Sequence, residues 1–90
     1  MTFIEAQQLF QENDLAGAIE ILNKRISVDS SDIQSLNLRA KIYFKMQSWG
    51  EAINDFSSVL EFEPQNQEAK SGLKMAENIL GYFTPDMFNP

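Results

Sequence analysis

The 90-residue sequence contains no cysteine and no histidine. Without cysteine the chain forms no disulfide and offers no thiolate ligand, and without histidine it has no imidazole to bind a metal. Neither side chain is there to act as a base or nucleophile near neutral pH. Carboxylate pairs such as Glu61 and Glu63 are spaced two residues apart, so they point to different faces of a helix. We therefore expect no metal site, no cofactor and no enzymatic activity.

Long apolar runs are also missing. No stretch approaches the roughly 20 apolar residues that a membrane-spanning helix needs. Residues 1–5 do not begin the basic region and apolar region of a signal peptide. From these two absences we expect a cytoplasmic protein without a membrane partner.

Positive charge is scarce, because seven Lys and Arg stand against thirteen Asp and Glu, for a formal net charge of −6. An acidic surface repels phosphate groups, so nucleic acid is not an expected partner.

What the sequence does contain is apolar material for one small core: 43% of its residues are hydrophobic, with seven phenylalanines among them. No segment alternates with period two, so we expect helices and no strands. Capping signals and Pro64 divide the chain into five expected helices. The expected helices cover residues 2–12 (capping box Thr2 and Glu5), 14–27 (cap Asp14), 31–46 (capping box Ser31 and Gln34), 48–63 (capping box Ser48 and Glu51) and about 66–80, with Gly81 as the stop.

Two stretches of the chain repeat each other at an offset of 34 residues. The identical pairs are Ala6 and Ala40, Phe10 and Phe44, Ala18 and Ala52, and Ile19 and Ile53. A period of about 34 residues is that of the tetratricopeptide helix–turn–helix unit. The second copy matches this unit best, through Leu36, Ala40, Tyr43, Ala52, Phe56 and the closing Pro64. The chain therefore resembles a tetratricopeptide repeat (TPR) protein over about residues 1–66.

This resemblance implies an all-α fold in which five antiparallel helices form a short right-handed superhelical stack. We expect a single domain at 1–80, with repeat one at about 1–32, repeat two at about 33–66 and a capping helix at about 67–80. On that last helix, Lys74 and Glu77 take the places of Ala40 and Tyr43, so a further repeat would bury two charges. A polar outer face of this kind is typical of the last helix of a repeat array.

In the TPR family the first helices of successive repeats line a concave groove that holds a peptide. The resemblance therefore implies a non-catalytic scaffold module for protein–protein interaction. The positions that would face the peptide are Phe3, Gln7, Phe10, Asn37, Lys41, Phe44, Met75 and Asn78. For Phe10 and Phe44, a place in the core is the alternative. The carboxylate clamp of chaperone-binding members is not expected, because Glu68 and Gly72 occupy two of its basic positions.

Two further features remain open at this level. Arg39, Lys41 and Lys45 form a basic strip that either anchors an acidic ligand group or is a solvated face with acidic partners across the stack.

Residues 81–90 form an apolar tail with Tyr82, Phe83, Met87 and Phe88. The tail either folds back onto its own domain or docks on another chain, and docking would give a homodimer by exchange of an identical element. Self-assembly through this tail is the alternative function.

Overall fold

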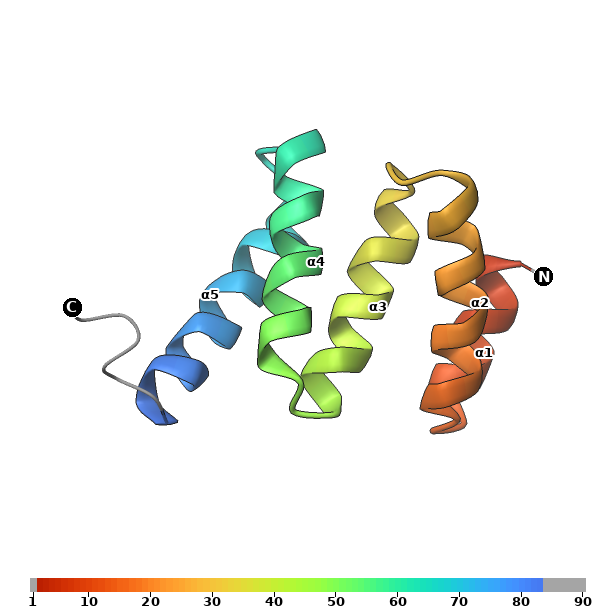
Figure 1. Cartoon of the computed structure of the whole chain (residues 1–90), viewed down its shortest axis with the longest axis horizontal. Helices are drawn as coiled ribbons and strands as arrows, with labels where there is room; N and C mark the ends of the chain where they lie inside the picture. Colours follow the sequence, from red (N-terminus) through yellow and green to blue (C-terminus); the bar gives the residue numbers. More distant parts are fainter. Residues whose placement is uncertain (1, 84–90) are drawn as a thin grey trace.

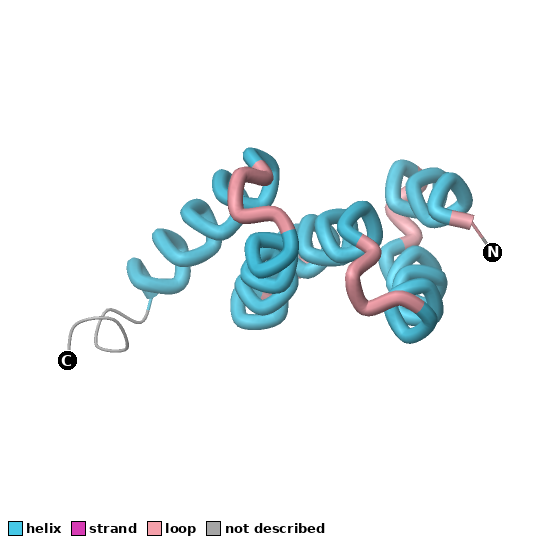
Figure 2. Tube along the Cα trace, turned by 90° about the horizontal axis from the view of Figure 1, so that it is seen from above, coloured by secondary structure: helices cyan, strands magenta, loops and turns pink. Residues whose placement is uncertain are grey.

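The computed structural model describes the backbone of residues 2–83 and the side chains of residues 2–81. Five helices follow one another and no strand occurs in this part of the chain. They are α1 (Phe3–Gln11), α2 (Leu15–Val28), α3 (Ile33–Lys45), α4 (Trp49–Phe62) and α5 (Gln67–Phe83). Figures 1 and 2 show them as a stack in chain order, with α1 and α2 at one end and α5 at the other. The expected all-α stack of TPR helix pairs is confirmed.

The turns inside the two repeats have the same geometry. Asn13 lies between α1 and α2 with φ 65°, and Gln47, 34 residues later, lies between α3 and α4 with φ 64°. Each turn is closed by a 2.8 Å backbone hydrogen bond, from Asp14 N to Leu9 O and from Ser48 N to Tyr43 O. The left-handed conformation ends one helix and reverses the chain into the next. The two repeats therefore share the same backbone conformation in this turn, although the side chains there differ.

The first two expected helix starts are confirmed. The Thr2 hydroxyl accepts a hydrogen bond from Glu5 N while the Glu5 carboxylate accepts one from Thr2 N, which makes the expected capping box. The Asp14 carboxylate accepts a hydrogen bond from Gly17 N at 3.0 Å.

Two expected helix boundaries, the start of α3 and the end of α5, were wrong. Asp32, and not Ser31, caps α3, because the Asp29 carboxylate engages both Ser31 N and Ser31 Oγ. These two hydrogen bonds lower the pKa of Asp29. Ser48 is the N-cap of α4 as expected, but its side chain makes no capping hydrogen bond, so the expected capping box does not form. Gly81 does not stop α5, since it keeps a helical conformation with no positive φ, and the helix continues to Phe83.

Two apolar clusters form the core. The first joins α1, α2 and α3 and contains Ala6, Ala18, Ile21, Leu22, Leu38 and Ile42. The second joins α3, α4 and α5 and contains Leu36, Ala40, Ala52, Phe56, Val59 and Ala69. The four alanines of the repeat signature have no exposed surface, as expected where helices approach closely. Helix α3 supplies residues to both clusters and therefore holds the two repeats together.

Candidate functional site: a two-part groove across α1, α3 and α5

The first helices of the repeat units, α1, α3 and α5, share one face of the stack. Two adjoining hollows lie along it, and we call them together the groove. The polar hollow has a volume of about 460 Å³ and is lined by Phe3, Gln7, Ile33, Gln34, Asn37, Leu38, Lys41, Glu63, Asn66 and Glu68. The apolar hollow has a volume of about 390 Å³ and is lined by Phe10, Lys41, Phe44, Phe56, Glu68, Ser71, Gly72 and Met75. Lys41 and Glu68 line both, so the two hollows adjoin each other.

Lys41 and Glu68 form an ion pair that joins α3 to α5 between the two hollows. Both side chains remain about half exposed. An exposed pair of this kind contributes little to stability, so its opening costs the fold little. Lys41 thus has an acidic partner across the stack, which is one of the two alternatives that the sequence left open.

Asn37 lies at the base of the polar hollow and is only 5% exposed. Its Nδ2 donates to Asn66 Oδ1 at 3.4 Å, and Asn66 Oδ1 also accepts from Ala69 N at the start of α5. Asn66 Nδ2 donates in turn to the Glu63 carboxylate. Asn37 therefore helps to fix the start of α5, while its own Oδ1 has no partner among the described residues.

Aromatic side chains shape the apolar hollow. Phe10 and Phe44 pack against the first and second core clusters respectively, and both also line the hollow. The Phe44 ring meets Trp49 edge to face with 5.0 Å between centroids. The Lys45 ammonium lies 5.5 Å from the centroid of Phe10, within the range of a cation–π contact. The two readings of Phe10 and Phe44, as core and as surface, are thus compatible.

Seven of the eight residues expected to face a peptide line one of the two hollows. Asn78 lines neither, although it is exposed on α5. Sequence reasoning did not include Glu63 and Asn66, which lie before and after the closing Pro64 in the connection from α4 to α5. Asn66 directly precedes a predicted helix and is a residue type that caps helices. This position was the sequence signal that could have identified it. The tail residues Met87 and Phe88 lie outside the described residues, as do the side chains of Tyr82 and Phe83.

Arg39 does not belong to the groove. Its guanidinium makes two 2.8 Å hydrogen bonds to the Asp55 carboxylate on α4 and one to Asn23 Oδ1 on α2. The hydrogen bond to Asp55 raises the pKa of Arg39 against the effect of its partial burial. The basic strip expected on α3 is therefore divided: Arg39 links α2, α3 and α4, and only Lys41 and Lys45 contact groove residues.

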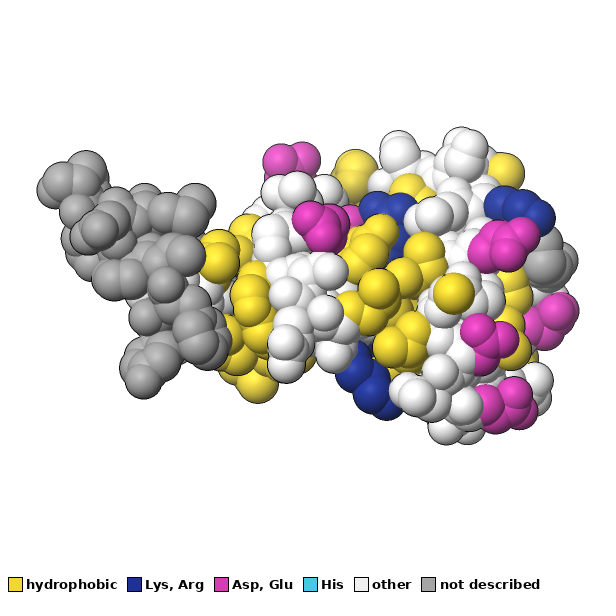
Figure 3. Space-filling view, turned by 60° about the horizontal axis from the view of Figure 1, so that its bottom comes forward, with side chains coloured by type: hydrophobic (Ala, Val, Ile, Leu, Met, Phe, Trp, Pro, Cys, Tyr) yellow, Lys and Arg dark blue, Asp and Glu magenta, His cyan; other side chains and the backbone are white. Residues whose placement is uncertain are grey.

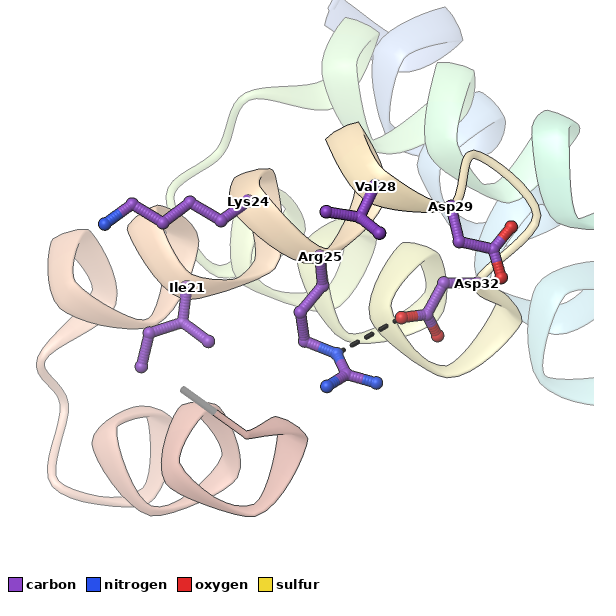
Figure 4. Close-up of a pocket in the computed structure, with 6 residues that line it drawn as sticks. All are labelled: Ile21, Lys24, Arg25, Val28, Asp29 and Asp32. Carbon is purple, nitrogen blue, oxygen red and sulfur yellow. Dashed lines mark hydrogen bonds and ion pairs between the residues drawn. The ribbon is translucent and has the colours of Figure 1, made fainter.

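A third hollow of about 400 Å³ lies outside the groove, between the end of α2 and the start of α3 (Figure 4). Arg25 Nε donates to Asp32 Oδ2 and to Ser35 Oγ, both at 3.1 Å. These contacts explain the presence of Arg25, because they hold the capping residue of α3, and we assign the hollow a structural role.

No helix within residues 2–83 is long and apolar enough to cross a bilayer. In the same part of the chain no three His, Cys, Asp or Glu side chains gather as a metal site requires.

A family model described as anaphase-promoting complex, cyclosome, subunit 3, matches residues 2–59, which include α1, α2, α3 and most of α4. No curated protein and no solved structure matches the chain. The matched family is TPR-like, and such repeat families are protein-interaction modules that are typically non-catalytic. Since the match covers more than half of the chain, the protein belongs to the anaphase-promoting complex, cyclosome, subunit 3 family of TPR-like repeat proteins.

Proposed function

We propose that the groove binds an extended peptide segment of a protein partner, without catalysis. The observation that supports this proposal is that a polar and an apolar hollow adjoin each other on one face of the stack. An extended peptide presents main-chain groups and side chains in alternation, and the two hollows fit these two kinds of group.

In the polar hollow, Gln7 and Gln34 are exposed amides on α1 and α3. An amide both donates and accepts, so it suits the N–H and C=O groups of a peptide main chain. Asn37 supports this hollow from below and contacts a ligand less directly, because its side chain is buried.

In the apolar hollow, Met75 is 52% exposed beside the half-buried Phe10 and Phe44. Flexible methionine and rigid aromatic rings together accept apolar side chains of different shapes. A large apolar residue of the peptide is therefore the expected occupant. Glu68 disfavours a peptide that ends in a carboxylate at this point, which argues against a chaperone-type clamp.

A matched pair of substitutions tests the groove. Met75→Glu places a charge in the apolar hollow, and Met46→Glu places the same charge on an equally exposed methionine after α3, outside both hollows. Peptides selected from a displayed library on the full chain serve as the probe, with affinity measured by fluorescence polarisation. We expect Met75→Glu to weaken binding by about tenfold or more, because a carboxylate in the hollow must be desolvated. Met46→Glu should bind as the unaltered chain does.

Equal binding by the two variants would place the ligand elsewhere and reject the groove. Circular dichroism of both variants shows whether the helices persist, which separates lost binding from lost folding.

A further inference from the structure

Helix α5 forms one wall of the apolar hollow. Ser71 and Met75 line the hollow, and Asn78 follows on the same face of α5 at i, i+4 and i+7. This face therefore continues from the hollow toward the end of α5 at Phe83. Figure 1 shows the end of α5 and the turn between α3 and α4 on the same side of the stack, at the bottom of the view.

The chain that follows α5 is long enough to return to the hollow. Met75 and Phe83 are eight residues apart on the helix, which corresponds to about 12 Å along its axis. Residues 84–88 span up to about 17 Å when extended. Phe88 therefore reaches the level of Met75 if the chain reverses direction directly after Phe83. Pro85 favours a reversal at this point, because its ring fixes a backbone angle common in turns.

The chemistry of residues 84–90 fits the hollow. Met87 and Phe88 are large and apolar, and Asp86 is the charged side chain of the segment. Lys45, the last residue of α3, holds its ammonium beside the Phe10 wall of the hollow. Figure 3 turns forward the lower side of the view in Figure 1, where the turns within the two repeats lie, and shows hydrophobic side chains on that side with lysine or arginine next to them. An acidic residue followed by two apolar ones complements such a surface.

We propose that residues 84–90 fold back along α5 of the same chain and place Met87 and Phe88 against Met75 in the apolar hollow. The segment is then an intramolecular occupant that a partner peptide must displace. Because it is tethered, its effective concentration at the hollow is in the millimolar range, so a weak contact suffices to occupy the site. This proposal rests on the proposed function, since the same hollow receives both segments.

Methionine methyl groups provide the direct test on the full chain. Its four methionines are Met1, Met46, Met75 and Met87, so a sample labelled with ¹³C at the methionine methyl groups gives few signals. We expect nuclear Overhauser contacts between the Met75 methyl group and the Phe88 ring. Phe88→Ala should shift the Met75 signal and leave the Met46 signal in place, whereas the neighbouring Asn89→Ala should leave both unchanged. A Met75 signal that does not respond to Phe88→Ala overturns the proposal.

Sedimentation equilibrium on the same samples separates the two possible sources of the segment. Contacts that persist at concentrations where the chain is a monomer support occupation by the same chain. Contacts that appear only together with a dimer assign the segment to a second copy and overturn the proposal.

Competition distinguishes this inference from the groove function itself. A library-selected peptide should bind Phe88→Ala about tenfold more tightly than the unaltered chain if the segment occupies the hollow nine-tenths of the time. Equal binding to both chains, with loss on Met75→Glu, overturns the inference and leaves the groove function standing. If no selected peptide binds at the hollow in either chain, the groove function fails, and the contact between Met75 and Phe88 is decided by the methyl spectra alone.

Discussion

Single residues of α3 divide between holding the fold and facing the groove. Lys41 and Arg39 are two positions apart, so they point to different sides of the helix. Lys41 pairs with Glu68 at the groove, while Arg39 turns toward Asp55 inside the stack. The residue types alone predict a basic strip on α3. Which of these charges lies at the surface and which stabilises the fold depends on the direction in which each side chain points.

Removing the Asp55 carboxylate tests the structural role of Arg39. The Asp55 side chain is 7% exposed and that of Arg39 is 20% exposed, so Asp55→Ala leaves a largely buried guanidinium without its counter-charge. We expect a loss of about 2–3 kcal/mol in the free energy of unfolding. Urea denaturation followed by circular dichroism measures it. Glu20→Ala, which removes an exposed partner of Lys24, is the control and should change stability by less than about 0.5 kcal/mol. Similar effects of the two substitutions would contradict the assignment.

At the scale of elements, the distance between α4 and α5 depends on one glycine. A Cβ atom built on Gly72 would lie 2.6 Å from Cε1 and Cε2 of Phe56, closer than carbon atoms pack. Phe56 is itself 2% exposed and fills the second core cluster. Gly72 therefore allows α5 to lie against the phenylalanine ring, and the same contact forms the floor of the apolar hollow.

Two glycine substitutions of opposite sign test this packing. Gly72→Ala should lower the free energy of unfolding by about 1–2 kcal/mol, because overpacking outweighs the gain in helix propensity. Gly50→Ala, at a position in α4 where a Cβ meets nothing within 4 Å, should raise it by about 0.5 kcal/mol. Thermal unfolding of the full chain measures both. Stabilisation by Gly72→Ala would mean that α5 shifts to accommodate the methyl group.

The whole molecule is a linear array in which each helix depends on its neighbours. Helix α3 buries six residues and contributes to both core clusters, whereas α1 buries only Ala6. In a repeat array the stability of a unit comes from its own core and from contacts with adjacent units. Local unfolding of the central helices should therefore be rarer than local unfolding of α1.

Hydrogen exchange followed by mass spectrometry tests this gradient along the chain. We expect amide protons of α3 and α4 to exchange slowest and those of α1 to exchange fastest, since local opening of α1 exposes little of the core. Uniform protection across the helices would instead indicate that the stack unfolds as one unit.

The sequence by itself determined the repeat and with it the architecture. An offset of 34 residues, small residues at the close approaches and local capping chemistry all act over short distances, and they predict helix number and order. Even here, local signals misplaced the start of α3 and the end of α5. A short motif does not show, for example, that Asp29 engages Ser31 and leaves Asp32 to cap α3.

Only the tertiary structure decided which surface residues belong together. Glu63 and Asn66 join Asn37 in one hollow although almost 30 residues separate them along the chain, and Glu68 finds Lys41 across the stack. Burial also distinguishes Arg39, whose side chain is held inside the stack, from Lys41, whose side chain is half exposed at the groove. Asn37 is buried beneath the polar hollow, so it supports the hollow and contacts a ligand less directly. Such contacts depend on how α5 packs against α3 and α4, and no periodic pattern in the sequence specifies that packing, because it results from the shapes of many side chains at once.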